Sequence, residues 1–97
     1  MLKIEKDTEG EIVLVGRFDA SQSDYATSQF ETVNSSCSVN FEQLEYISSA
    51  GLSVLLVTQK RLMESGDGLR LVKLNKHIYD VFKIAGFHHV FEIEDSI

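Results

Sequence analysis

The alternation of apolar and polar residues at the start of the chain predicts a β-hairpin. Leu2 and Ile4 alternate with charged neighbours, as in a strand with one buried face. Residues 7–10, Asp-Thr-Glu-Gly, have the composition of a turn. Residues 11–18 contain several β-branched side chains and predict a longer second strand. We therefore expect an antiparallel strand pair at the beginning of the chain.

Two further segments space their apolar residues as helices do. Residues 21–33 would place four apolar side chains on one face, namely Tyr25, Ala26, Phe30 and Val33. The clearest helix is expected over residues 50–64, where apolar residues recur at i, i+3 and i+4. These apolar positions are Leu52, Leu55, Leu56, Leu62 and Met63, with Val54 and Val57 widening the face.

The remaining segments complete an alternation of strands and helices. Residues 37–41 predict a short strand, and residues 42–47 a linking loop or strand edge with Leu44, Tyr46 and Ile47 turned inward. Strands are also expected over residues 69–74 and 90–93. Between them, Asn75 is the cap of a helix that ends at Gly86. Its apolar face would consist of Ile78, Val81, Phe82 and Ala85.

This order of elements, β-β-α-β-α-β-α-β, predicts an α/β fold. We expect a small mixed sheet of about four to five strands, mostly parallel, with helices packed on one face. The N-terminal hairpin should lie at the edge of this sheet. Residues 1–97 contain no linker and no internal repeat, which indicates a single domain.

Composition and charge exclude several classes of function. The net charge is −6, and basic residues form no cluster, so the chain lacks the electrostatic footprint of a nucleic-acid binder. No apolar run approaches the ~18 residues of a membrane span, and the first residues do not resemble a signal peptide. The single cysteine, Cys37, forms neither an internal disulfide nor a zinc site and is expected to pack as a small hydrophobe. These features favour a cytoplasmic protein.

The junction between residues 47 and 52 combines two serines with the start of the strongest helix. Ser48 or Ser49 should be the helix N-cap, where free N–H groups and the positive end of the helix dipole lie. Such a position suits an anion, including a phosphate on the serine itself. Ala50 and Gly51 are the smallest residues, so they should not block another protein from reaching the serine hydroxyl. The alternative is that both serines serve only as caps.

Residues 40–56, NFEQLEYISSAGLSVLL, resemble the signature region of STAS domains, specifically of bacterial anti-sigma factor antagonists. That family has an apolar strand, a loop, and then Asp-Ser-(Ser/Thr)-Gly-Leu at the start of a helix. The likeness continues in residues 15–19, which match the end of the family's second strand, and in residues 66–72 and 81–87. It therefore extends over nearly the whole chain in the right order.

The resemblance implies a regulatory switch with no enzymatic activity and no cofactor of its own. Ser49 falls at the phosphorylated serine of the family, with Ser48 in place of the usual acid and Ala50 in place of the following hydroxyl residue. The unphosphorylated form would bind an anti-sigma factor, a serine kinase of the histidine-kinase-like ATPase fold. This kinase would phosphorylate Ser49 with ATP and magnesium held on its own chain, and a serine phosphatase would reset the switch.

The resemblance also implies a set of residues around Ser49. Asp19 and Ser48 would support the switch, and the residues expected to contact the partner are Ala20, Ser21, Ala50, Gly51, Leu52 and Ser53. For Asp19, a purely structural role as the cap of the first helix is equally expected. The chain itself should be monomeric when free.

Other readings of the same residues remain. A STAS domain can instead be a non-phosphorylated subunit that docks on a membrane transporter or its ATPase. His77, His88 and His89 are not expected to form a metal site, because adjacent histidines in an extended segment point to opposite sides. A hydrolase built on Ser49 lacks the Gly-x-Ser-x-Gly elbow. The acidic residues Glu92, Glu94 and Asp95 are expected to form a solvated tail.

Overall fold

The opening hairpin forms as its alternation predicts. In a computed structural model that describes residues 1–94, β1 (Leu2–Lys6) pairs antiparallel with β2 (Ile12–Phe18). Gly16 has φ +100°, and a Cβ at this position would collide with the carbonyl oxygen of Met1. The backbone N–H of Arg17 donates to that same oxygen at 3.0 Å. A glycine is therefore required where the chain start approaches β2 most closely.

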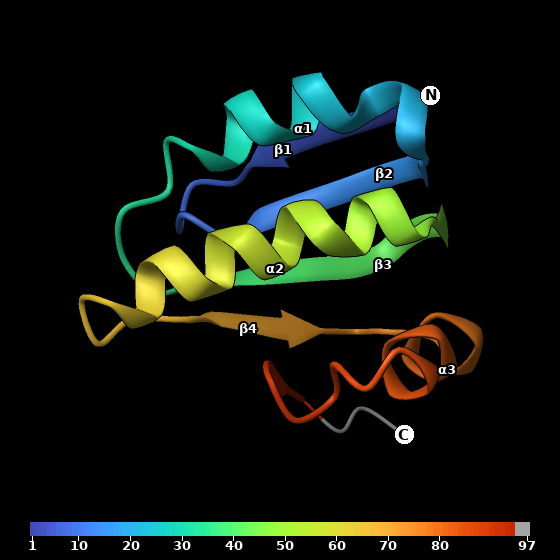
Figure 1. Cartoon of the computed structure of the whole chain (residues 1–97). Coiled ribbons are helices and arrows are strands. Elements are labelled where there is room, and N and C mark those ends of the chain that lie inside the picture. Colours follow the sequence, from blue (N-terminus) through green and yellow to red (C-terminus); the bar gives the residue numbers. More distant parts are fainter. Residues whose placement is uncertain (95–97) are drawn as a thin grey trace.

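A five-stranded sheet follows, in the order β1-β2-β3-β4-β5 (Figure 1). The later strands are β3 (Cys37–Ile47), β4 (Leu69–Val72) and β5 (Glu92–Ile93), and each pairs parallel with its neighbour. The mostly parallel sheet with the hairpin at its edge is thus confirmed. The strands predicted over 69–74 and 90–93 are both shorter than expected.

One correction concerns residues 42–47, which continue β3 and do not form a separate linker. The pairing of β3 with β2 shifts register twice, between Val13 and Val15 and between Gly16 and Arg17. Such irregularities break the two-residue alternation that a strand prediction depends on. Leu44 and Ile47 are buried as expected, but Tyr46 lies outside the core, with the Arg17 guanidinium 4.4 Å from its ring centroid.

The first helical segment is shorter and more complex than the predicted helix over 21–33. A 3-10 turn, η1 (Ala20–Gln22), precedes α1 (Ser23–Phe30). Val33 is buried but lies beyond the helix end, and Tyr25 is 40% exposed. The two remaining helices, α2 (Ser49–Met63) and α3 (Lys76–Ile84), lie within about one residue of their predicted ranges, and Asn75 caps α3.

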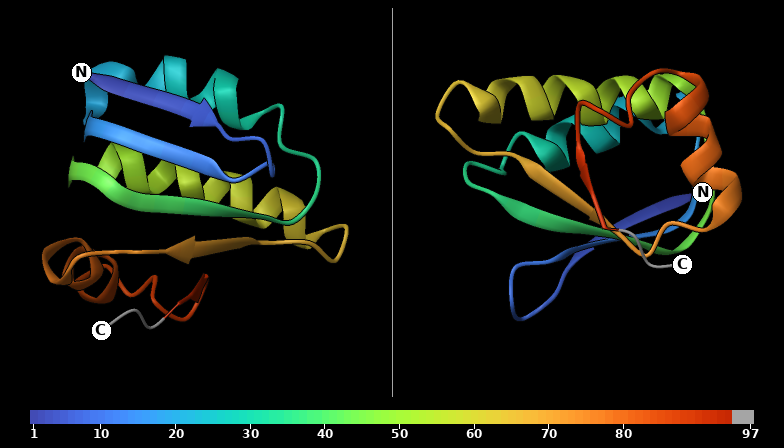
Figure 2. Two further views of the ribbon diagram at one scale, coloured as in Figure 1. Left: turned by 180° about the vertical axis from the view of Figure 1, so that it is seen from behind. Right: turned by 90° about the horizontal axis from the view of Figure 1, so that it is seen from below.

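Helices α1 and α2 lie on the same face of the sheet, and α3 lies at the end of the sheet towards which β4 runs (Figures 1 and 2). The core fills the space between these helices and the strands. Phe82 of α3 makes edge-to-face contacts with Phe41 and Phe91, at centroid distances of 5.8 and 5.6 Å. Ala85 is exposed, which differs from the predicted apolar face of α3.

The buried face of α2 differs from the predicted one, because some apolar residues are exposed and some polar residues are buried. Val57 and Met63 were expected to be inside but are 65% and 56% exposed. Thr58 and Gln59 are buried in their place, because they lie three and four residues after Leu55, on the same face of the helix. Within residues 1–94, no helix is both long and apolar enough to cross a bilayer. The expectation for Asp95 lies outside the described residues.

Candidate functional site

Ser48 and Ser49 occupy different structural positions at the start of α2. Ser48 is the N-cap, and its Oγ accepts a hydrogen bond from the Gly51 N–H at 3.2 Å. Its own N–H donates to the Phe18 carbonyl oxygen at 2.9 Å, which anchors the cap to the end of β2. Ser49 is the first residue of the helix, and its side chain is exposed. The structure therefore assigns the cap to Ser48 and leaves the Ser49 hydroxyl open to solvent.

Gly51 and Leu52 hold the start of α2 against the sheet. A Cβ at Gly51 would lie 2.8 Å from Ile47 Cγ1 and 3.0 Å from Phe18 Cγ, both closer than normal contacts. Leu52 is only 4% exposed. Both residues were expected to contact a partner, but their burial gives them a packing role. The absence of a Cβ at Gly51 is what allows the Ser48–Ser49 turn to approach β2 and β3.

Asp19 lies at the same edge of the sheet as Ser48. Phe18 and Ile47 are paired in the parallel β2–β3 ladder, so the residues that follow them leave the sheet together. The Asp19 carboxylate accepts hydrogen bonds from the Ser21 hydroxyl at 2.6 Å and the Ser21 N–H at 2.9 Å. These bonds from Ser21 lower the pKa of Asp19. The predicted capping role is confirmed, for the 3-10 turn that leads into α1.

The remaining predicted contact residues lie on two elements that contact each other, η1 and α2. Ala20 and Ser21 are exposed on η1, which contacts α2, while Ser53 is exposed and Ala50 is half-buried on α2. The Ser53 hydroxyl donates to the Ser49 carbonyl oxygen at 3.0 Å. No acidic residue lies in the first turn of α2, so the positive end of its dipole is not neutralised there.

A groove between α1 and α2 extends this surface and was not predicted. It has a volume of about 560 Å³ and is lined in part by Thr27, Ala50, Ser53, Val57 and Arg61. The Arg61 guanidinium donates to the Phe30 and Val33 carbonyl oxygens and so links the two helices. Val57 lines this groove but was expected to lie inside, so the apolar pattern of α2 did not indicate the groove.

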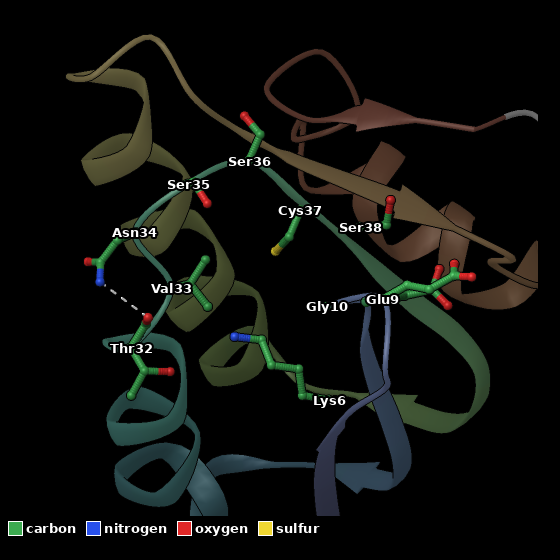
Figure 3. Close-up of a pocket in the computed structure, with 11 residues that line it drawn as sticks. Lys6, Glu9, Gly10, Thr32, Val33, Asn34, Ser35, Ser36, Cys37 and Ser38 are labelled. Atoms are coloured by element: carbon green, nitrogen blue, oxygen red, sulfur yellow. Dashed lines mark hydrogen bonds between the residues drawn. The ribbon is translucent and has the colours of Figure 1, made fainter.

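A second cleft lies at the opposite end of β3, where that strand begins (Figure 3). It measures about 650 Å³, and Lys6, Thr32 and Cys37 are among its lining residues. Cys37 is half-buried against the core, broadly as predicted, and burial raises the pKa of its thiol. A protonated thiol is a poor nucleophile, so this cleft shows no sign of cysteine chemistry.

The prediction that His88 and His89 point apart is wrong. They lie in a turn and not in an extended segment, and their ring centroids are 3.9 Å apart. The Nδ1 atom of His88 is buried without a hydrogen-bond partner in the described part of the chain. Within residues 1–94, no group of three or more metal-ligating side chains comes together.

Comparison with known proteins agrees with the observed fold. The family model described as "Mlab, STAS domain" matches residues 3–93. The chain belongs to the STAS domain family. This STAS domain is 43% identical over 54 residues to BtrV of Bordetella bronchiseptica, whose name marks it as a candidate anti-sigma factor antagonist. That match includes 56% of this chain and 47% of BtrV, so the similar segment spans about half the length of the curated relative.

Solved structures show the same fold at low sequence identity. The anti-sigma factor antagonist SpoIIAA in its unphosphorylated form is 17% identical, with a TM-score of 0.72 over 100% of this chain and 90% of that one. The Bacillus cell fate determinant SpoIIAA in the phosphorylated form is also 17% identical. Its TM-score is 0.69 over 99% of this chain and 93% of that one. At this identity, the comparison establishes the fold alone.

Proposed function

We propose that this STAS domain is a phosphorylation-controlled regulator that binds an anti-sigma factor when Ser49 is unmodified and releases it when Ser49 is phosphorylated. The observation that carries the proposal is the exposed Ser49 hydroxyl beside a Ser48 hydroxyl already used as the helix cap. One of two adjacent serines is thus free for a kinase, and its modification leaves the cap intact. The similarity to BtrV and to the fold of SpoIIAA supports this role.

The charge of a phosphate is sufficient to drive release. A phosphate adds about −1.5 to −2 charges, which takes the domain from −6 to about −8. Within the domain, the start of α2 would stabilise that charge by only ~0.3–1 kcal/mol. At a tight interface, a charge without a partner costs ~2–5 kcal/mol. Because the second effect is larger, binding weakens more than about a hundredfold for a penalty of ~3 kcal/mol, without any change of fold.

The proposed contact surface consists of the exposed residues around Ser49. Ala20 and Ser21 are exposed on η1, which contacts α2, and Ala50 and Ser53 follow Ser49 on α2. Gly51 and Leu52 support this surface from below, and Ser48 holds the turn that presents it. The Asp19 carboxylate positions Ser21 through its hydrogen bonds. Asp19 therefore contributes to partner binding by ordering η1.

The proposed partner is a serine kinase of the histidine-kinase-like ATPase fold that is itself the anti-sigma factor. Such a kinase would supply ATP and magnesium, so the STAS domain contributes only the acceptor hydroxyl. A serine phosphatase would hydrolyse the phosphate and restore binding. In this scheme the domain acts as a regulator and substrate, free in the cytoplasm as a monomer.

The test is a pull-down from the native host with Ser49→Ala as bait and Ser49→Asp as its charged counterpart. We expect Ser49→Ala to retain an ATPase-fold kinase and Ser49→Asp to lose it, with affinities that differ by about a hundredfold. After incubation with host lysate and ATP, mass spectrometry should place the phosphate on Ser49. Equal affinities for both variants would contradict the switch.

Ser48→Ala is the matched control, because it alters the neighbouring hydroxyl. Loss of the cap should lower the stability by about 1 kcal/mol, while Ser49 remains available for phosphorylation. A phosphate found on Ser48 and not on Ser49 would contradict the proposed site. Capture of a transporter ATPase by both Ser49 variants would instead support the non-phosphorylated transporter subunit.

A further inference from the structure

The outer edge of β1 is a row of backbone groups that the sheet leaves unpaired. β1 is the terminal strand of the sheet, as Figure 2 shows. At its two ends, the Arg17 N–H donates to the Met1 carbonyl oxygen, and the Asp7 N–H donates to the Glu11 carbonyl oxygen. Odd-numbered residues therefore bond to β2. The alternation of an antiparallel ladder then turns the backbone N–H and C=O groups of residues 2, 4 and 6 away from β2.

A single side chain covers the centre of this edge. The Ile4 N–H donates to the Tyr25 hydroxyl of α1 at 3.2 Å. That hydroxyl takes the place that the carbonyl oxygen of a neighbouring strand would occupy. Tyr25 is 40% exposed, so its ring is not held there by deep burial. Exposed edge strands are templates for pairing with another chain, and a side chain across the edge prevents it.

The sequence of β1 complements itself when two copies run antiparallel. If a two-fold axis passes through Ile4, then Ile4 lies opposite Ile4 of the second copy. Lys3 then lies opposite Glu5 of the second copy, and Glu5 opposite Lys3. Both side chains are on the same face of the sheet and are 69% and 50% exposed, and within one chain they form an exposed ion pair, with 3.7 Å between Lys3 Nζ and Glu5 Oε2. Opposite charges at directly facing positions stabilise such pairs, whereas axes through Lys3 or Glu5 would place like charges together.

We propose that the outer edge of β1 is a docking edge for a second copy of this chain, and that Tyr25 keeps this edge closed. In the closed state the Ile4 N–H is bonded to Tyr25, and the chain is monomeric. When Tyr25 is displaced, the Ile4 N–H and C=O groups of the two copies bond to each other, and one sheet continues through both. This proposal does not depend on Ser49 or on its modification.

The first experiment compares the wild-type chain with Tyr25→Ala and Tyr25→Phe by sedimentation velocity over a range of concentrations. Tyr25→Ala removes both the hydroxyl and the ring, and we expect its dimer dissociation constant to be at least about tenfold lower than that of the wild type. Tyr25→Phe frees the Ile4 N–H but keeps the ring across the edge. Its dimer dissociation constant should therefore lie between those of the wild type and Tyr25→Ala. Far-UV circular dichroism establishes that each variant is folded.

The second experiment uses charge reversal in the Tyr25→Ala background to locate the interface. Lys3→Glu alone and Glu5→Lys alone each place like charges opposite one another on both sides of the axis. Each substitution should raise the dimer dissociation constant by about tenfold. Mixing the two reversed variants restores opposite charges, so we expect the heterodimer to have a lower dissociation constant than either homodimer. The double variant Lys3→Glu/Glu5→Lys should also regain the homodimer.

Three results would overturn the proposal. The first is a Tyr25→Ala chain that is folded and remains monomeric at every concentration. The second is a dimer whose dissociation constant is unchanged by the charge reversals, since the contact between the two copies would then lie elsewhere. The third is a wild-type chain that dimerises as strongly as Tyr25→Ala, which would show that Tyr25 does not close the edge. Slower amide exchange at Ile4 in the Tyr25→Ala dimer than in the Tyr25→Ala monomer would place the contact at the outer edge of β1.

Discussion

Ser48 and Ser49 are adjacent and chemically identical, yet the backbone gives them separate roles. At Ser48 the backbone is extended, with φ −91° and ψ 173°, and this geometry lets the side chain accept from the Gly51 N–H. Ser49 is already the first residue of the helix and is exposed, whereas the Ser48 hydroxyl is engaged by the Gly51 N–H. A kinase would therefore meet one accessible hydroxyl at this turn.

Gly51 is the residue whose replacement tests the close packing of this turn. In an exposed helix, Gly→Ala stabilises by about 0.5–1 kcal/mol. Here the added Cβ would lie 2.8 Å from Ile47 Cγ1 and 3.0 Å from Phe18 Cγ. We therefore expect the opposite sign, a loss of about 1–3 kcal/mol of unfolding free energy, measured by chemical denaturation.

Ser53→Ala is the control for this prediction, because residue 53 is exposed on the same helix. Its effect on stability should be within about 0.5 kcal/mol. If Gly51→Ala were as stable as the wild type, the packing of α2 against Phe18 and Ile47 would be looser than the structure shows.

At the scale of elements, α2 joins parts of the fold that are distant in sequence. The buried Gln59 amide accepts from the Leu69 N–H at 2.7 Å and donates to the Val90 carbonyl oxygen at 2.9 Å. It thus links the start of β4 to the turn that precedes β5. On the opposite side of α2, Arg61 bonds to the carboxyl end of α1. Helix α2 is therefore a structural connector as well as the carrier of Ser49.

Gln59→Leu should separate these two roles of α2. The substitution keeps the volume approximately but removes both hydrogen bonds of the side chain. Each buried group left unpaired costs about 1–3 kcal/mol, so we expect a clearly lower midpoint of urea unfolding. Partner binding through Ser49 should persist in the folded fraction. Lys60→Gln, on the exposed face of the same helix, should leave the midpoint unchanged.

At the scale of the whole molecule, we expect the free energy of unfolding to depend on pH through His88, in the turn after α3. Burial of the His88 ring, together with the nearby His89 and Lys83 charges, lowers the pKa of His88 below its ordinary 6.5. The unfolded chain then binds a proton at higher pH than the folded chain. The contribution of neutral His88 to stability is therefore fully present above pH 6.5 and is lost as the pH falls from 6.5 towards the folded pKa of His88.

We expect the melting temperature of the wild type to fall more between pH ~7.5 and ~5 than that of His88→Gln. His77→Gln is the matched control for removal of an imidazole, because His77 is exposed on α3. Identical pH profiles for the wild type and His88→Gln would show that protonation of His88 is not coupled to folding.

Much of the fold could be predicted from local pattern, whereas Ser49 was singled out by the family resemblance. The hairpin, the range of α2 and the Asn75 cap all depend on neighbours within a few residues. The continuation of β3 to Ile47 could not be predicted, because register shifts against β2 interrupt its alternation. The stacking of His88 on His89 was also missed, since it requires a turn that the sequence does not mark.

The sequence by itself determined the order of elements, the acidic charge and the place of two serines before an amphipathic helix, because these follow from spacing along one chain. Only the tertiary structure decided which serine is the cap, which apolar residues of α2 stay outside, and that Tyr25 reaches the edge of β1. These outcomes depend on contacts between segments that are far apart in sequence. Their geometry is set by the packing of helices on the sheet, which no local pattern encodes.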